Sequence, residues 1–577
     1  MKGLNVIFRV MNECTTSNMD NKKKYCSSEN NGELVCDLRS LDLEELDTKL
    51  LEEEESPVST DSEIKVVTSS CLKLRNITQL LLDHNELQSL PHEVCELKCL
   101  NKLSIVGNFL QSLPENIGDL KNLTILNVDE NNLDLLPGSF NRLNNLQVFS
   151  AIANKLHILN KDIFSGLTNL KKLYLDENRI ATLPNCFGKM TSLKVFECCE
   201  NSLQALPESI GDLSSLEILN LDSNVLSHLP FSFSLLPKLR VLLLSNNKIK
   251  ELPETMACSK VLERLCLEKN DLSELPLWFS DLKNITDLAF DDNELSNKVF
   301  SEDFCNSAHQ LESLSAGRNY ITELPENIGL LGNLKTLHLG STMMELERSN
   351  FQSGNWLSSL PASFVNLTNM KKLHLDENQI RELPSEIGNL SNLEWLDLGQ
   401  NQLDSLPDSF CNLHSLTYLQ ISKNRLKSLP EDIGNLENLI ELRVDSNMLT
   451  SVPLSIAKLK ALKSLDLFNN CISEFPKGIL SLNNLKRLDL DRNNFSLENI
   501  PRILPTNFYP ERDVTLKDNW RGKTREDKIK CEVISMPSID NEDETHSKEE
   551  EEEVYFNASA LRNAMKAGMS MWRKHDG

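Results

Sequence analysis

The sequence has too few basic residues to balance its acidic ones, and it has no long apolar run. Of its 577 residues, 60 are lysine or arginine and 85 are aspartate or glutamate, so the formal net charge is −25. This acidity argues against binding to nucleic acids or to anionic membranes, because both require a basic face on the protein. No stretch of about 18 apolar residues is present, so we expect no transmembrane segment.

The cysteines lack the clustering of a disulfide-stabilised domain. The 15 cysteines are scattered along the chain, and an odd number leaves at least one of them unpaired. The apolar run from Gly3 to Met11 is interrupted by Asn5 and Arg9 and is too short for a signal peptide. Free thiols without an export signal favour a reducing compartment, so we expect a cytoplasmic protein.

The motifs that carry common chemistry are also missing. There is no P-loop, no G-x-G-x-x-G, no H-E-x-x-H and no kinase signature. Neither Cys95 with Cys99 nor Cys198 with Cys199 has a histidine at ligand spacing, so small core side chains are the better interpretation. Carboxylate pairs abound, but an open, solvated face does not tune them for acid–base work. We therefore expect no catalytic residues, no metal site and no cofactor.

What the sequence does contain is one repeated pattern, L-x-x-L-x-L-x-x-N-x-L. Its asparagine occurs 18 times, and most copies are 23 residues apart, as Asn378 and Asn401 are. In 15 of the 18 units a proline follows six residues later, as Pro384 follows Asn378. The asparagines are Asn85, Asn108, Asn131, Asn154, Asn178, Asn201, Asn224, Asn247, Asn270, Asn293, Asn319, Asn355, Asn378, Asn401, Asn424, Asn447, Asn470 and Asn493.

Each recurring position has a physical role. Alternate residues of a strand point to opposite faces, so Leu373 and Leu375 should enter the core whereas His374 and Asp376 should point outward. The asparagine amide should be buried, where it both donates and accepts hydrogen bonds with the backbone of its own and neighbouring turns. The proline opens the convex return segment. One unit cannot bury its apolar face alone, so the units must stack into a solenoid.

The segment L-P-S-E-I-G-N-L-S-N-L-E-W-L-D-L-G-Q-N-Q-L, Leu383 to Leu403, resembles the intracellular Ras-group leucine-rich repeats. That family includes the suppressor-of-clear type of scaffold, which links Ras to Raf signalling, and, as more distant relatives, the LAP polarity proteins. The resemblance covers about residues 72–505. It predicts an α/β repeat solenoid, a leucine-rich repeat horseshoe with a parallel concave sheet, about 18 repeats of 23 residues and disordered termini.

The resemblance also implies a function and partners. It implies a non-catalytic, protein-binding scaffold in intracellular signal transduction, in the Ras/MAP-kinase pathway, with a Ras-type GTPase as a partner. That type of scaffold also docks a phosphatase catalytic subunit through a V-x-F element in its N-terminal leg. Val6, Ile7 and Phe8 match this element, with Lys2 as the only upstream base, although three-residue matches often arise by chance. The alternative is a regulatory or targeting subunit for a phosphatase or ubiquitin ligase.

The composition divides the chain around the repeats. Residues 1–70 are polar and are expected to form a mostly disordered leg, followed by the solenoid at residues 71–505. An insertion at residues 341–354 is either a loop on the binding side or a tolerated surface loop. Residues 506–535 are expected to cap the solenoid, and residues 536–556 to form an acidic linker.

The last segment has a different character. Residues 557–577 are predicted to form a short amphipathic helix, decorated by Arg562, Lys566, Arg573 and Lys574. Such a helix is suited to docking a partner or a membrane surface, and the alternatives are that it folds back onto the acidic solenoid or stays frayed. The acidic tail and this helix depart from the pattern of the Ras–Raf scaffold.

Two aromatic residues mark the candidate partner-binding region of the concave face. Trp395 and Tyr418 occupy the same outward column of successive strands, so their rings are expected to be neighbours at strand spacing. Trp and Tyr are enriched at the energetic centres of interfaces; the alternative is that they shield the strand backbone. The other residues of this candidate site are His374, Asp397, Gln420, Arg443, Asp376, Glu377 and Asp445.

Acidic residues recur just before the asparagine. An electronegative stripe on the concave face would select a basic partner and make binding sensitive to salt. The alternative is that each aspartate caps the turn after its strand. Two positions before the asparagine lie Asp83, Asp129, Asp176, Asp222, Glu268, Asp291, Asp376, Asp445 and Asp491, and one position before it lie Glu130, Glu177, Glu200, Asp292 and Glu377.

Overall fold

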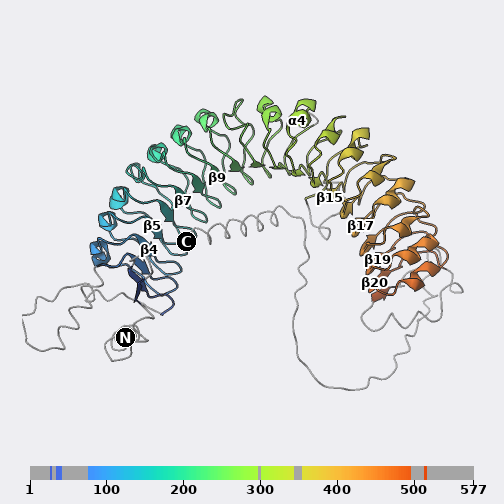
Figure 1. Ribbon diagram of the computed structural model, residues 1–577, viewed down its shortest axis with the longest axis horizontal. Helices are drawn as coiled ribbons and strands as arrows, with labels where there is room; N and C mark the ends of the chain where they lie inside the picture. The colour runs from blue at the N-terminus through green and yellow to red at the C-terminus, as the bar shows by residue number, and fades with distance from the viewer. Residues whose placement is uncertain are drawn as a thin grey trace, which may run out of the picture.

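The described part of the chain forms one arc-shaped solenoid. Short strands line its inner, concave edge, and loops and short helices line its outer, convex edge (Figure 1). The V-x-F match, the acidic linker and the predicted terminal helix lie outside the described residues. The computed structural model describes residues 26–28, 34–41, 76–296, 300–342, 354–495 and 513–515.

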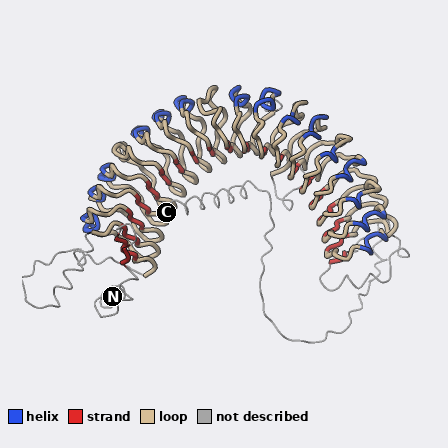
Figure 2. Tube along the Cα trace, in the orientation of Figure 1, coloured by secondary structure: helices blue, strands red, loops and turns tan. Residues whose placement is uncertain are grey.

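Each repeat contributes one three-residue strand to the concave side, and neighbouring strands pair in parallel (Figure 2). Leu373, Leu396 and Leu419 lie opposite one another in successive strands, so the register repeats without slippage. The strands of the 18 asparagine repeats are β3 (Gln79–Leu81), β4 (Lys102–Ser104), β5 (Ile125–Asn127), β6 (Val148–Ser150), β7 (Lys172–Tyr174), β8 (Val195–Glu197), β9 (Ile218–Asn220), β10 (Val241–Leu243), β11 (Arg264–Cys266), β12 (Asp287–Ala289), β13 (Ser313–Ser315), β14 (Thr336–His338), β15 (Lys372–His374), β16 (Trp395–Asp397), β17 (Tyr418–Gln420), β18 (Glu441–Arg443), β19 (Ser464–Asp466) and β20 (Arg487–Asp489).

The convex side returns mostly through short 3-10 helices. The proline of the pattern directly precedes many of them; Pro407, for example, has a φ of −69° before η13, and its missing N–H has no helical partner to lose there. The 3-10 helices are η2 (His92–Glu96), η3 (Ile117–Asp119), η4 (Gly138–Arg142), η5 (Asn185–Lys189), η6 (Glu208–Asp212), η7 (Phe231–Leu235), η8 (Leu277–Asp281), η10 (Ile328–Leu330), η11 (Ala362–Asn366), η12 (Ile387–Asn389), η13 (Asp408–Asn412), η14 (Ile433–Asn435), η15 (Leu454–Lys458) and η16 (Lys477–Ser481).

One repeat carries an α-helix, α4 (Glu302–Ser307), in place of a 3-10 turn. Its N-cap, Ser301, accepts a hydrogen bond from the backbone N–H of Phe304, which satisfies one of the free donors at a helix start. This is the repeat between Asn293 and Asn319, which is longer than 23 residues. The extra residues provide the length that a full α-helical turn needs.

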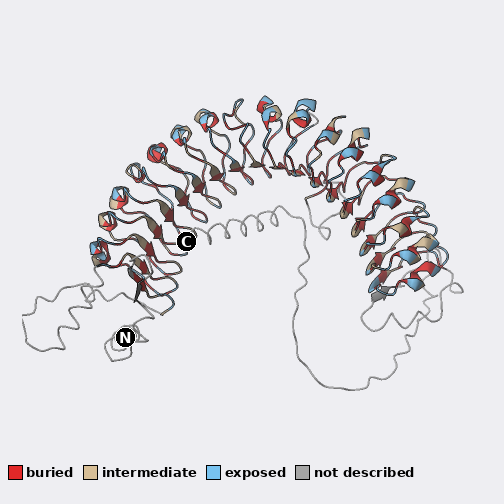
Figure 3. Ribbon diagram, viewed as in Figure 1, coloured by how far each residue is buried: buried red, intermediate tan, exposed pale blue. Residues whose placement is uncertain are grey.

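The core lies between the strands and the convex turns and runs as one cluster from Cys36 to Phe495. Figure 3 shows this burial along the inner side of the arc, with exposed positions on the convex turns. Phenylalanines fill wider layers, and the ring of Phe187 lies 4.7 Å from that of Phe196. Cysteines of the pattern join this core: burial raises the pKa of Cys95 to about 12, so its thiol stays protonated.

The asparagines tie each repeat to the one before it. The Nδ2 of Asn401 donates to Leu398 O in its own repeat at 3.1 Å and to Leu375 O in the previous repeat at 2.8 Å. Its Oδ1 accepts from Ile380 N of the previous repeat at 3.0 Å. The amide therefore both donates and accepts, as the sequence pattern predicts, and it bridges two repeats.

Asn355 holds the corresponding place in the repeat with the insertion. Its Oδ1 accepts from Ile321 N at 3.1 Å, and its Nδ2 donates to Ala316 O at 2.8 Å and Leu339 O at 3.0 Å. The ladder is therefore continuous across the insertion. The extra residues stand between the end of β14 and Asn355 in the sequence, and residues 343–353 lie outside the described part.

The residue before the asparagine has a left-handed backbone in every repeat except the one with the insertion. The φ of Lys423 is 55°, and its N–H donates to Asp445 O of the next repeat at 2.9 Å. Gly107, with a φ of 65°, is a glycine with this backbone, whereas Gly354, which precedes Asn355, does not have a positive φ. Side chains with a Cβ are strained in this region, so the hydrogen bond to the next repeat must hold the turn.

Two short segments of the leg at residues 1–70, which was expected to be mostly disordered, form strands. β1 (Cys26–Ser28) pairs antiparallel with β2 (Leu34–Asp37), and β2 pairs in parallel with β3. The Nδ2 of Asn85 donates to Leu38 O at 2.9 Å and its Oδ1 accepts from Leu41 N at 3.0 Å, so the ladder extends to this hairpin. The hairpin pairs with the otherwise open edge of β3, a tertiary contact that polar composition does not reveal.

The sheet also continues past the last asparagine repeat. β21 (Asp513–Thr515) pairs in parallel with β20, with Val514 opposite Leu488. This strand lies within residues 506–535, the segment expected to cap the solenoid. With β1, β2 and β21 the sheet has 21 strands.

Candidate functional site

Trp395 and Tyr418 form a stacked pair on the concave face. β16 and β17 pair with these two residues directly opposite each other. Their ring centroids lie 3.6 Å apart with planes 10° apart. The repeat places them in one column, and strand spacing brings the flat faces of the rings together. Both side chains are half-buried.

Two further side chains occupy the ends of this stack. The imidazole of His374 lies on the Trp395 side, with centroids 6.0 Å apart and planes 29° apart. The guanidinium of Arg443 lies over the Tyr418 ring, 5.8 Å from its centroid, and also pairs with Glu441. The stack thus runs across β15, β16, β17 and β18. Because neighbours cover the ring faces, the ring edges are the parts that an incoming partner would meet.

The polar column beside the stack is more buried than the sequence indicates. His374, Asp397 and Gln420 are each less than a tenth exposed, and Gln420 Oε1 accepts a hydrogen bond from the Tyr418 hydroxyl at 2.8 Å. These side chains support the aromatic pair from below. Trp395, Tyr418, Arg443 and Asp445 are half-buried and remain accessible on the concave side.

Asp376 and Glu377 are fully buried, contrary to the expectation that they face a partner. The chain re-enters the solenoid over them after the insertion. A Cβ placed on Gly354 would lie 2.5 Å from Glu377 O and 2.8 Å from Asp376 O, so its backbone packs directly on theirs. Gln400 Nε2 donates to Glu377 Oε1 at 3.3 Å. The insertion, which sequence spacing locates but does not orient, is the reason for this burial.

Many aspartates of the predicted stripe cap the next repeat. Asp83 Oδ1 accepts from Ser104 Oγ at 2.6 Å and from Val106 N at 2.9 Å. The structure therefore supports the capping alternative for these positions. The same bond to the backbone of the next repeat is made by Asp129, Asp176, Asp222 and Asp291.

One carboxylate near the C-terminal end of the concave side has a raised pKa. Asp466 lies on β19, and burial raises its pKa to about 6, an effect to which the charges of Asp445 and Asp489 add. Desolvation disfavours the charged form of this carboxyl.

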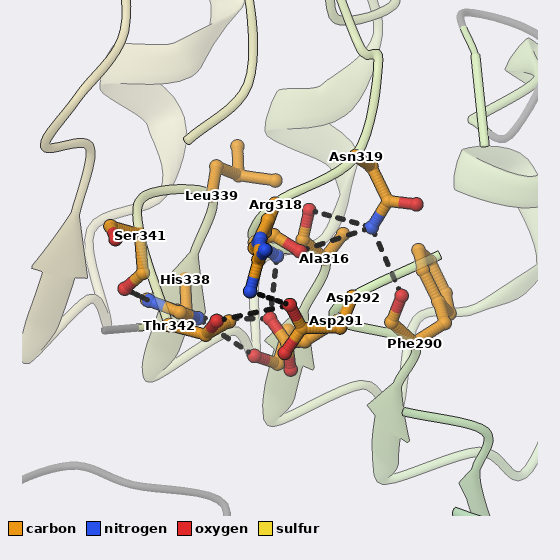
Figure 4. Close-up of polar contacts among 12 residues, drawn as sticks. Phe290, Asp291, Asp292, Ala316, Arg318, Asn319, His338, Leu339, Ser341 and Thr342 are labelled. Atoms are coloured by element: carbon orange, nitrogen blue, oxygen red, sulfur yellow. Dashed lines mark hydrogen bonds and ion pairs between the residues drawn. The ribbon is translucent and has the colours of Figure 1, made fainter. Parts of the chain in front are cut away.

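A buried network links three repeats beside the insertion (Figure 4). His338 Nδ1 lies 3.0 Å from Asp291 Oδ1, and its Nε2 lies 3.1 Å from Ser341 O. Burial alone would lower the pKa of His338, but the hydrogen bond and charge of Asp291 outweigh it and raise the pKa to about 9. Arg318 Nη1 pairs with Asp292 Oδ1 at 3.0 Å. The network anchors the point at which the insertion leaves β14.

Sequence reasoning missed His338. Its signal was available, because His338 and His374 stand at the same position of successive strands, in L-H-L-G and L-H-L-D. Their rings lie 5.4 Å apart in an edge-to-face arrangement. The sequence also did not indicate a second feature, the approach of three potential metal ligands. His374, Asp376 and Asp397 each offer a ligand atom within 4.8 Å of the others.

Family models match two parts of the repeat array. The model described as "Leucine-rich repeat region" matches residues 361–451. The model described as "Leucine rich repeat" matches residues 152–197, 169–226, 191–249 and 437–495. The protein is a leucine-rich repeat solenoid. The matches do not distinguish the Ras group from other leucine-rich repeats.

Solved structures share the solenoid over most of the chain. The leucine-rich repeat ectodomain of the Arabidopsis thaliana receptor kinase GASSHO1/SCHENGEN3, in complex with CASPARIAN STRIP INTEGRITY FACTOR 2, is 29% identical with a TM-score of 0.64. That match covers 74% of this chain and 52% of the receptor chain, so this chain spans about half the receptor's length. YopM from Yersinia enterocolitica is 26% identical with a TM-score of 0.56, covering 80% of this chain and 96% of YopM.

Other comparisons add the fold alone. The plant peptide hormone receptor RGFR1, in complex with RGF2, is 23% identical with a TM-score of 0.58, and the match covers 82% of this chain and 87% of the receptor chain. No curated protein sequence matches this leucine-rich repeat chain. Among the described residues, no helix has both the length and the apolar character needed to cross a lipid bilayer.

Proposed function

We propose that this leucine-rich repeat protein is a non-catalytic, cytoplasmic scaffold that binds another protein on its concave face. The observation that carries the proposal is the half-buried Trp395–Tyr418 stack, which Arg443 covers at one end. The core beneath these strands is formed by leucines, so the two aromatic side chains are not required to fill it. Trp, Tyr and Arg are the residue types most enriched at interface hot spots. Leucine-rich repeat proteins generally mediate protein–protein binding, and the similar receptor kinase ectodomain was solved in complex with CASPARIAN STRIP INTEGRITY FACTOR 2.

The pathway and compartment belong to the same proposal. The sequence resemblance to the Ras-group repeats supports an assembly around a Ras-type GTPase in MAP-kinase signalling. Cys95, Cys198 and Cys258 are free thiols in the core, which supports a reducing compartment. The net charge of −25 supports a partner with a basic face.

The test is affinity purification of the full chain from cell lysate, with bound proteins identified by mass spectrometry. Three baits are compared: the parent, Trp395→Ala, and Trp356→Ala as the control. Trp356 is also exposed to solvent, but its ring packs on Tyr320, away from the Trp395 stack. We expect a partner that the parent and the control recover and Trp395→Ala loses, with a loss of about 2 kcal/mol in the purified pair.

Repeating the purification with different guanine nucleotides distinguishes a GTPase partner from a catalytic subunit. A scaffold around a GTPase recovers it with a non-hydrolysable GTP analogue and not with GDP. A targeting subunit would instead recover a phosphatase or ligase catalytic subunit equally with both nucleotides, and that result would replace the GTPase proposal. If all three baits recover the same proteins in the same amounts, the concave site is not the binding surface.

A further inference from the structure

His374, Asp376 and Asp397 converge below the aromatic stack. His374 ends β15 and Asp397 ends β16, so parallel pairing sets them side by side. Asp376 follows His374 by two residues and returns to the same side of the chain. One nitrogen of the imidazole and one oxygen of each carboxylate lie within 4.8 Å of one another, and all three residues are buried. They come from two strands of a rigid sheet rather than from loops.

Asp376 is not used as a cap in the way that Asp83, Asp129 and Asp176 of its column are. Asp445 shares this difference, since Phe468 N donates to Asp466 Oδ1. Asp83, Asp129 and Asp176 each accept from the backbone N–H that lies 23 residues ahead. The equivalent donor for Asp376 is Gly399 N, but this N–H donates to Asp397 Oδ1 instead, at 2.9 Å. Asp397 thus performs the cap. The carboxylate of Asp376 is directed toward the cluster, where its Oδ2 accepts from Ser341 N at 3.2 Å.

Glycine makes room for this arrangement. A Cβ on Gly340, the residue that faces the cluster from the preceding repeat, would lie 2.1 Å from Asp376 Oδ1. Any other residue at position 340 would push that carboxylate away from its neighbours. The close approach of a backbone to a functional group is a usual reason for glycine at such a site. The cluster is therefore shaped by three consecutive repeats.

The donor atoms of the cluster are of the kinds that bind a divalent cation. Two carboxylates this close repel each other, and burial increases the cost of keeping both ionised. A divalent cation between them removes the repulsion and uses the imidazole nitrogen as a third ligand. Imidazole with carboxylates suits first-row transition metals, whereas Mg²⁺ and Ca²⁺ favour sites made of oxygen alone.

We propose that His374, Asp376 and Asp397 form a site for a first-row divalent cation, with Zn²⁺ as the representative ion. Bond lengths of about 2.0–2.2 Å place tetrahedral ligand atoms roughly 3.4 Å apart. The three ligand atoms lie within 4.8 Å of one another, so binding requires them to move closer by side-chain rotation. Three protein ligands leave one position for water or for a side chain of a bound protein. The ion would also orient His374, whose ring ends the Trp395 stack.

The site is tested by calorimetric titration of the purified, chelator-treated full chain with Zn²⁺. The test variants are His374→Gln, Asp376→Asn and Asp397→Asn, which keep side-chain size and remove a ligand. The matched control is His414→Gln, an exposed histidine on the convex side. We expect the parent and the control to bind one high-affinity Zn²⁺, and each test variant to bind it at least about tenfold more weakly.

Two further measurements separate this site from the alternatives. The absorption spectrum of the protein with Co²⁺ in place of Zn²⁺ should show visible bands without the near-ultraviolet charge-transfer band of cysteine ligands. If that band appears at the first equivalent of Co²⁺, the ion is bound by thiols and the proposal is overturned. In thermal unfolding, the difference in Tm between Asp376→Asn and the parent should change sign with metal. Without metal the variant should have the higher Tm, because a buried charge is removed. With saturating Zn²⁺ it should have the lower Tm, because a ligand is lost. Equal Zn²⁺ affinities in all five proteins would show that the ion binds elsewhere and would overturn the proposal.

Discussion

His338 and Asp291 are joined across an intervening strand. His338 ends β14 and Asp291 lies just beyond β12, yet Nδ1 and Oδ1 are 3.0 Å apart. Between them, Gly317 beyond β13 donates its N–H to the same Oδ1 at 2.5 Å. A Cβ on Gly317 would lie 2.7 Å from the His338 ring and 2.9 Å from the Asp291 carboxylate. This pair therefore requires glycine at position 317, and it holds three repeats together.

The pair predicts a dependence of stability on pH. The native pKa of His338 is raised to about 9, above its ordinary value of 6.5. The contribution of the His338–Asp291 pair to the free energy of unfolding is therefore fully present below pH 6.5 and is lost as the pH rises toward 9. We expect the gap in unfolding free energy between the parent and His338→Gln, on the order of 3 kcal/mol below pH 6.5, to shrink across this window. Urea unfolding from pH 6 to 9.5 measures it, and parallel curves would contradict it.

The asparagine ladder predicts an unequal effect of two asparagine substitutions. Asn401→Ala removes a buried amide that bonds two repeats and leaves Ile380 N without its acceptor, so we expect a loss of about 1–3 kcal/mol. Asn392→Ala is the control, because this exposed asparagine makes one bond, to Thr368 O at 2.9 Å. It should cost no more than about 0.5 kcal/mol. An unchanged denaturation midpoint for Asn401→Ala would refute the structural role of the ladder.

The aromatic stack predicts a coupling between Trp395 and Tyr418. Each alanine substitution should lower stability modestly, because the rings pack on each other and not on the leucine core. In a double-mutant cycle we expect a coupling of about 0.5–1.5 kcal/mol, typical of aromatic pairs. Trp395→Ala combined with Trp356→Ala is the control, and these effects should add. Additive effects for Trp395 and Tyr418 would mean that the stack does not form in solution.

The left-handed position predicts which substitutions Lys423 tolerates. Its φ of 55° disfavours β-branched side chains, so Lys423→Ile should lower the unfolding free energy by about 1 kcal/mol or more. Lys423→Asn and Lys423→Gly should stay within about 0.5 kcal/mol of the parent, since both residues accept positive φ. Lys427→Ile, at an exposed position of the same turn region, controls for lost charge. Thermal unfolding of the four variants measures these effects. An equal loss of stability in Lys423→Ile and Lys427→Ile would show that the backbone argument is wrong.

The repeat made much of this architecture predictable from sequence. Because the pattern recurs at a nearly constant spacing, the strand of each repeat and the column of each residue follow from counting. The neighbourhood of Trp395 and Tyr418 could be predicted for this reason, and so could the place of Asn355 after the insertion. The hairpin at β1 and β2 could not, because its short segments lie outside the repeated pattern and pair with the edge of β3, a tertiary contact.

The sequence alone determined the solenoid, its number of asparagine repeats and the order of side chains along its concave face, since these depend on periodicity and local turn chemistry. The tertiary structure alone decided which of those side chains are accessible. Asp376 and Glu377 are buried because the chain returns over them at Gly354. The partners of Asp291 and His338 also lie in different repeats. Contacts between repeats depend on stacking geometry and on the path of an insertion, and neither is encoded in the spacing of a repeated motif.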